Sequence, residues 1–227
     1  MRNLPRPQVP HNFEEIRLSF SQAYPPAAPE RTEGRRWEAF KNEKQAMYAL
    51  IKERLLQNQQ GLCAFCECEL TECNREIEHF RPKSSTSPEQ DWTICFTNYT
   101  LSCKGKISAE EDDHCGHLKD DIEPEGNILD PYELPLQPLV KYEVTDQKLR
   151  LLPDADACHR EKVDVALVQL TMDNLGLNCC SLMRSRWEVW NSLNDQIADT
   201  LDIPNEQQVE EQQNLVEDNI MPVNGMF

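Results

Sequence analysis

Ten cysteines are spread along this chain of 227 residues, and four of them have spacings typical of metal ligands. The segment Cys63-Ala-Phe-Cys66 carries two thiols three positions apart, and Cys103 and Cys115 follow beyond a long connection. Zn²⁺ prefers four soft ligands in a tetrahedron, and two pairs that meet across a loop supply them with little chain strain. The sequence therefore predicts a structural zinc site that contains Cys63 and Cys66.

The second half of this zinc site is less well defined, because eleven residues separate Cys103 from Cys115. We expect these two thiols to complete the site, and four other side chains remain as substitutes: Cys68, Cys73, Cys95 and His114. The remaining cysteines are expected to be buried thiols in a helical region: Cys158, Cys179 and Cys180. Thiols at this density without an apolar signal segment favour a reducing compartment, in which disulfides are uncommon.

A second group of side chains lies among the thiols: Glu78, His79, Asn98 and His117. Cleaving a phosphodiester with water requires a base for the nucleophile and a cation for the charge of the transition state. The imidazole of His79 suits the first task, since a neutral ring accepts a proton near physiological pH. An isolated Glu-His pair is usually a packing feature, but its place between the two thiol pairs favours hydrolysis of a phosphodiester.

The strand expected at residues 76–80 limits what Glu78 and His79 can do together. Neighbouring side chains on a strand start on opposite faces. The two side chains therefore reach one ion only if the strand twists or ends there.

Upstream of the thiols, an apolar stripe at helical spacing predicts a helix from Thr32 to Gln60, with Thr32 as N-cap and Gly61 as the stop. The stripe consists of Trp37, Phe40, Lys44/Met47, Leu50/Ile51 and Leu55, and we expect it to pack on the zinc site. The opposite face is basic: Arg35, Arg36, Lys41, Lys52 and Arg54. It is interpreted either as a solvated face or as a phosphate-contacting face beside the catalytic groove.

For the segments on either side of this region, the sequence predicts an arm, a hairpin, helices and a tail. Six prolines in residues 1–30 indicate an extended arm, with a short helix around Phe13–Phe20. After residue 126 the pattern predicts a small β hairpin, Tyr142–Val144 with Leu149–Leu152, and then two helices packed as a helical hairpin. The first of these helices carries Val163, Leu167, Leu170 and Leu175, and the second runs from about Ser181 to Leu201. An acidic tail follows at 204–227.

The formal net charge of −17 argues against a free-standing nucleic-acid binder, which usually presents a basic face to phosphates. Part of the acidic excess belongs to the region after Arg186, which contains nine acidic residues and no basic one. We infer that a partner supplies much of the substrate affinity, or that metal ions neutralise the site. No run approaches the roughly 18 apolar residues of a membrane span, so we expect a soluble, cytoplasmic protein without a membrane partner.

Four motifs together resemble the HNH endonucleases: Cys-x-x-Cys, Glu-His-Phe-x-Pro-Lys, Asn-Tyr-x-Leu-x-Cys and Cys-x-x-x-Lys. Over most of the chain, the pattern is similar to the HNH nuclease subunit of the Septu anti-phage system and of related retron-associated systems. This resemblance implies an α+β fold, in which a ββα-metal, treble-clef-like zinc finger core is flanked by helices. The segments would be an arm (1–30), a packing helix (31–61), the nuclease core (62–126), the two hairpins (127–203) and the tail (204–227).

The resemblance also implies a role for each site residue. His79 would be the general base, facing a hard cation across the nucleotide backbone, and Asn98 would hold the loop that orients it. Glu78 and His117 would bind one catalytic ion, Mg²⁺ or Mn²⁺. The structural zinc would be held by Cys63, Cys66, Cys103 and Cys115, and phosphate would be contacted by Arg81, Lys83 and Lys119.

One position departs from the family pattern. Many relatives carry His or Asn directly after the last zinc cysteine, whereas this chain has Gly116. His117 is therefore our replacement for the third HNH position, and His114 is the second choice.

The resemblance implies partners as well: an ABC-type ATPase, a nucleic-acid substrate, and in the retron setting a reverse transcriptase with its non-coding RNA and msDNA. Two other interpretations stay open. One is a non-catalytic, zinc-stabilised treble-clef adaptor, and the other is a degenerate nuclease subunit.

Overall fold

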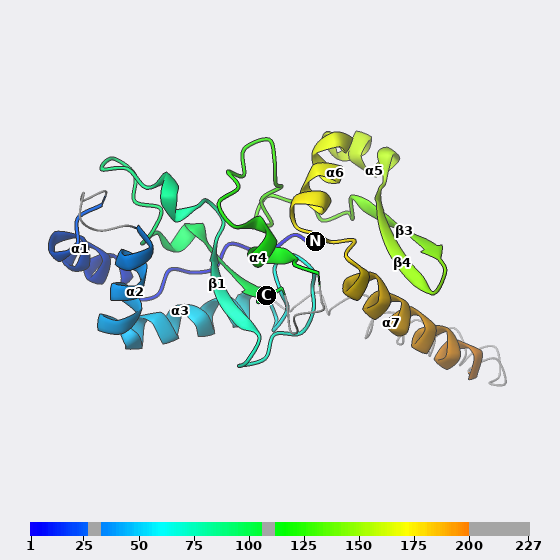
Figure 1. Ribbon diagram of the computed structural model, residues 1–227, viewed down its shortest axis with the longest axis horizontal. Helices are drawn as coiled ribbons and strands as arrows, with labels where there is room; N and C mark the ends of the chain where they lie inside the picture. Colours follow the sequence, from blue (N-terminus) through cyan, green and yellow to red (C-terminus); the bar gives the residue numbers. More distant parts are fainter. Residues whose placement is uncertain (27–32, 106–111, 200–227) are drawn as a thin grey trace.

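The computed structural model describes residues 1–26, 33–105 and 112–199, and within them the chain has the mixed α+β fold expected from its sequence. Its strands form two separate antiparallel sheets of two strands each. The first three helices lie at one end of an elongated molecule, one sheet lies in the middle, and the second sheet lies with the last helices at the other end (Figure 1). The predicted N-cap Thr32 and the predicted tail 204–227 are outside the described residues.

Two helices replace the single packing helix that we expected. α2 spans Glu33–Glu43 and α3 spans Gln45–Asn58, and they are separated at Lys44, whose φ of −117° and ψ of 41° are not helical. The break falls where a lysine interrupts the apolar stripe. Most of the stripe is buried as predicted, namely Trp37, Phe40, Met47, Ile51 and Leu55, whereas Leu50 is 39% exposed. The stop at Gly61 is confirmed, because its φ of +77° is a left-handed conformation that favours glycine.

α1 spans Phe13–Ala23, where the sequence predicts a short helix, and its two phenylalanines are buried. A buried ion pair joins it to the rest of the fold. Arg36 on α2 donates to both carboxylate oxygens of Asp91 at 2.6 and 2.5 Å, and also to the Tyr24 carbonyl and the Ser21 hydroxyl. One guanidinium thus connects α1, α2 and the loop that precedes the second strand of the central sheet.

The central sheet pairs β1 (Arg75–His79) with β2 (Tyr99–Cys103), so that Glu78 lies opposite Thr100 and His79 lies opposite Tyr99. Short 3-10 helices, η1 (Lys83–Ser85) and η2 (Phe96–Asn98), lie between the two strands in sequence. All five residues of β2 are buried. α3 and the five-residue helix α4 (Cys115–Lys119) both pack on β2. Through β2, the sheet therefore connects the α2–α3 end of the molecule with α4.

The predicted β hairpin is confirmed as β3 (Val140–Thr145) and β4 (Lys148–Pro153). Three helices follow it: α5 (Ala155–Glu161), α6 (Val165–Asn174) and α7 (Cys180–Asp199). The predicted helical hairpin is not formed, because α7 packs along β4, while α6 contacts β4 and α5 (Figure 1). The side chain of Asn178 bonds both the N–H and the carbonyl of Leu151, which directs the chain along β4 before α7 begins.

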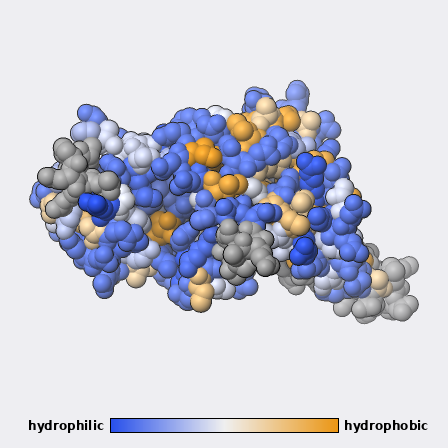
Figure 2. Space-filling model, viewed as in Figure 1, coloured by the Kyte–Doolittle hydropathy of each residue, from blue (hydrophilic) through white to orange (hydrophobic). Residues whose placement is uncertain are grey.

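The face shown in Figure 2 is hydrophilic over most of its area, in keeping with the net charge of −17. Among the described residues, no helix is long and apolar enough to cross a membrane. The main apolar core lies beneath this surface and contains Cys63, Cys103 and Cys115 together with the aromatic side chains of α1 and α2.

Candidate functional site

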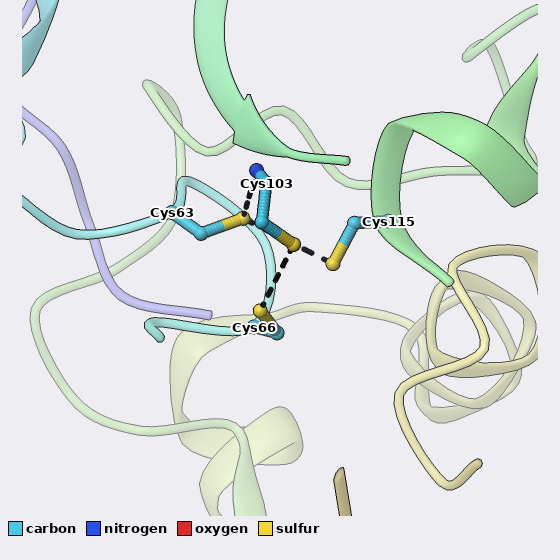
Figure 3. Close-up of side chains that lie close together, drawn as sticks. All are labelled: Cys63, Cys66, Cys103 and Cys115. Atoms are coloured by element: carbon cyan, nitrogen blue, oxygen red, sulfur yellow. Dashed lines mark hydrogen bonds between the residues drawn. The ribbon is translucent and has the colours of Figure 1, made fainter. Parts of the chain in front are cut away.

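Four thiols converge at the junction of three elements (Figure 3). Cys63 and Cys66 lie in the turn after α3, Cys103 ends β2, and Cys115 begins α4. Their sulfur atoms all lie within 4.8 Å of one another, with Cys66 Sγ 3.7 Å from Cys103 Sγ and Cys63 Sγ 3.9 Å from Cys115 Sγ. Zn–S bonds of about 2.3 Å give a sulfur tetrahedron with edges of about 3.8 Å. The donor set therefore fits a zinc ion.

Zinc binds cysteines as thiolates, and the surroundings lower the pKa of Cys63 and Cys103 but raise that of Cys66 and Cys115. The backbone N–H of Cys103 donates to Cys63 Sγ at 3.3 Å. Hydrogen bonding to Cys115 lowers the pKa of the Cys103 thiol to about 5, whereas burial raises the pKa of Cys115. His114 lies beside the cluster, with Nδ1 3.2 Å from Cys115 Sγ. This residue, our second choice for the third HNH position, therefore contacts the thiols.

His79 ends β1 on the face toward α2. Its ring meets Trp37 at right angles, with the ring centroids 4.6 Å apart, and packs against Tyr99 on the other strand. The residue is only 3% exposed. This burial differs from our expectation of an imidazole that faces a cation across a nucleotide backbone.

The structure gives the His79 ring one polar contact, and this contact determines the tautomer of the ring. His79 Nε2 lies 3.0 Å from the Thr93 carbonyl, which can only accept, so Nε2 carries the proton and Nδ1 keeps its lone pair. Burial, with a smaller effect from the charge of Lys83, lowers the pKa of His79 to about 3. The ring is therefore neutral at physiological pH and has an acceptor nitrogen.

Asn98, in η2, joins the two chain segments beside His79. Its side-chain amide donates to the carbonyls of Arg81 and Trp92 at 2.9 Å each, and its side-chain oxygen accepts from Arg81 N–H at 2.7 Å. Trp92 directly precedes Thr93, whose carbonyl meets His79. The structure thus brings Asn98 into the hydrogen-bond network around His79.

Glu78 points to the opposite face of β1, toward α4. Its Oε1 accepts from Lys119 Nζ at 3.0 Å, and a Cβ added to Gly116 would lie 2.7 Å from its Oε2. Burial raises the pKa of Glu78 to about 7, although the charge of Lys119 opposes this shift. The carboxylate thus occupies the space that a side chain at position 116 would need, which gives a physical reason for the glycine.

The described residues do not assemble the expected divalent-ion site. Lys119 is fully buried against Glu78, rather than free to contact phosphate. The side chain of His117 is 55% exposed, and its Nε2 lies 3.5 Å from Asp113 Oδ1. Glu78 and His117 therefore have different partners, and the Lys119 ammonium is already bonded to the carboxylate of Glu78. This arrangement does not fit an ion held by Glu78 and His117.

The other two side chains expected to contact phosphate differ in their surroundings. Arg81 forms ion pairs with Glu123 and Glu125, and its guanidinium lies 4.6 Å from the centre of the Trp92 ring. Lys83 is half-buried, and its charge affects the pKa of His79. Of the two, Lys83 is the cation whose electrostatic effect reaches the imidazole.

Sequence reasoning missed the residues that support His79. Trp37 was part of the apolar stripe, but the stripe did not reveal that it would contact an imidazole. The contact with Thr93 is made by its backbone carbonyl, so no pattern of side chains in the sequence could indicate it. Asp91, which anchors this loop through Arg36 and the N–H of Ile94, could be found only from the folded chain.

Comparison with known proteins gives two relatives. The chain is 28% identical over 178 residues to an Escherichia coli protein named "Retron Ec83 putative HNH endonuclease", covering 66% of this chain and 68% of the relative. It is 27% identical over 135 residues to a Vibrio cholerae protein named "Retron Vc95 putative HNH endonuclease", covering 59% of this chain and 60% of that relative. No protein-family profile and no solved structure matches. The two relatives support an HNH endonuclease family.

Proposed function

We propose that this protein is an HNH endonuclease that hydrolyses phosphodiester bonds of nucleic acid. The observation that carries the proposal is the bond between His79 Nε2 and the Thr93 carbonyl, which leaves Nδ1 as a proton acceptor. The names of the two relatives support the same activity.

The proposed core is a ββα-metal zinc finger within residues 62–126, formed by β1, β2 and α4. The order of these elements supports it, as do the four thiols that meet at the end of β2 and the start of α4. Zinc bound by Cys63, Cys66, Cys103 and Cys115 would supply a structural cross-link and no chemistry. The remaining proposed segments are the arm (1–30), the packing helices (31–61), the region 127–203 and the tail (204–227).

In the proposed reaction, His79 Nδ1 takes a proton from the attacking water. Asn98 keeps the Thr93 carbonyl in place by holding Trp92, and so maintains the tautomer of His79. Because the ring is 3% exposed, the side chains that cover it must move when substrate binds. The resemblance adds Mg²⁺ or Mn²⁺ at Glu78 and His117, and since those residues have other partners, no step is assigned to that ion.

The test is cleavage by His79→Ala. We expect this variant to lose plasmid nicking by at least about 100-fold, the usual contribution of a general base. His159→Ala, at an exposed histidine on α5, is the matched control and should cut like wild type. Both variants should keep their zinc and their secondary structure. Full cleavage by a folded His79→Ala protein would refute the assigned role of His79.

The biological setting is proposed from the relatives and from the resemblance. The relatives' names place them with retrons, which supports a reverse transcriptase with its RNA and msDNA as partners. The Septu resemblance adds an ABC-type ATPase, and the proposed location is the cytoplasm in an anti-phage defence complex. Co-purification of the tagged chain with the products of its neighbouring genes tests these partners, and recovery of the chain alone would contradict them.

A degenerate nuclease subunit is the second candidate, favoured by the burial of His79 and by the ammonium at Glu78. It predicts zinc binding and partner binding without cleavage. Plasmid nicking by the purified complex, abolished in His79→Ala, would exclude both this candidate and the zinc-stabilised adaptor.

A further inference from the structure

Lys119 is the only lysine of the described residues that is fully buried, and its ammonium lies among oxygens. Nζ donates to Glu78 Oε1 at 3.0 Å, to the His79 carbonyl at 2.9 Å and to the Asp120 carbonyl at 3.4 Å. One of these oxygens is charged and two are backbone carbonyls. Such a set is also what a hard divalent cation selects, because Mg²⁺ and Mn²⁺ prefer carboxylate, carbonyl and water oxygens.

A second observation points to the same place. Thr100 lies directly opposite Glu78 in the β1–β2 ladder, so both side chains are on the face that α4 covers. Thr100 is fully buried, and its Oγ1 has no hydrogen-bond partner in the described structure. A buried hydroxyl without a partner is costly, so this face has an unused oxygen beside the carboxylate.

We propose that the Lys119 ammonium is a built-in substitute for a divalent cation at Glu78, so that an ion binds this carboxylate only when the lysine side chain is away. The inference refines the proposed nuclease, whose family pattern would place a metal at Glu78. A divalent ion and Lys119 compete for the same oxygens. The apparent affinity for the ion is therefore the affinity of the lysine-free site multiplied by the fraction of molecules in which the lysine has left.

The test is binding of MnCl₂ to the zinc-loaded full chain, followed by electron paramagnetic resonance and by thermal unfolding. Lys119→Ala removes the ammonium and leaves space, so it should bind one Mn²⁺ at least about tenfold more tightly than wild type and gain thermal stability from it. Lys119→Met also removes the charge but fills the space, and should gain little. Glu78→Gln in the Lys119→Ala background should remove the new Mn²⁺ site.

A comparison of wild type with Glu78→Gln decides the matter if Lys119→Ala does not fold. The amide oxygen that this substitution introduces can still accept the bond from Lys119, so folding is expected, and the two proteins should bind Mn²⁺ alike. If Glu78→Gln binds Mn²⁺ at least about tenfold more weakly than wild type, Glu78 is already a ligand and the inference is wrong. Because binding is measured without substrate, a loss of the proposed nuclease activity in other assays leaves this result unaffected.

Discussion

At the scale of single residues, the site is divided by the pleat of one strand. His79 and Glu78 are neighbours, yet His79 faces Trp37 on α2 and Glu78 faces Lys119 on α4. The imidazole is held as a neutral acceptor by a backbone carbonyl, and the carboxylate is held by an ammonium. Each side chain is thus positioned by a different helix, although Lys119 also donates to the backbone carbonyl of His79.

The buried imidazole predicts a specific pH dependence of stability. The pKa of His79 is about 3 in the folded protein, against 6.5 as its ordinary value, so the unfolded state binds the extra proton. Its contribution is fully present above about pH 6.5 and is lost as the pH falls toward 3. Between pH 7 and pH 5, wild type should lose about 2 kcal/mol more than His79→Gln, measured by urea unfolding. Equal losses in the two proteins would contradict the buried neutral ring.

At the scale of elements, zinc would cross-link three pieces of chain: the turn after α3, the end of β2 and the start of α4. α4 has only five residues, and it is joined to the turn after α3 and to the end of β2 through Cys115. A helix of this length is not stable by itself, so its position depends on tertiary contacts and on the metal.

The zinc site gives the second prediction. Purified protein should contain one zinc per chain by elemental analysis, and Cys66→Ser should lose it. Cys73→Ser, at an exposed cysteine outside the cluster, should retain zinc. Removal of the metal with a chelator should lower the midpoint of thermal unfolding in wild type and in Cys73→Ser alike, because the folding free energy includes metal binding. Zinc retention by Cys66→Ser would place a different ligand in the site.

The ion pair between Arg36 on α2 and Asp91 gives the third prediction. Arg36→Met leaves Asp91 charged and without its bidentate partner in a largely buried place, which should cost about 3–5 kcal/mol of folding free energy. Arg35→Met, at the exposed neighbouring position, should change it by less than about 0.5 kcal/mol. Chemical unfolding of both variants measures the difference, and similar values would show that the ion pair does not hold α2 in place.

At the scale of the whole molecule, the charge opposes nucleic-acid binding by this chain alone. The net charge of −17 repels a polyanion, and Arg81 is paired with two glutamates. A nuclease of this composition would depend on partners to deliver its substrate. This dependence accords with the retron setting of the relatives.

The fourth prediction follows from this charge. The purified chain should bind a short DNA duplex with a Kd above about 100 μM at about 150 mM salt, the weak end of non-specific affinity. Fluorescence anisotropy with a labelled duplex measures it, with a basic DNA-binding protein as positive control. A Kd below about 1 μM would reveal a basic surface that outweighs the net charge.

Local patterns in the sequence determined the helix stripe around Trp37, a strand at about residues 76–80, the β hairpin formed near residues 142–152, and the thiols able to meet at one metal. These follow from spacing, because helical period, strand alternation and ligand pairs are properties of short segments. Only the tertiary structure decided that Lys119 lies on Glu78 and that Thr93 meets His79. Such contacts join residues far apart in the chain, and which partner reaches each face of β1 depends on how α2 and α4 pack against it.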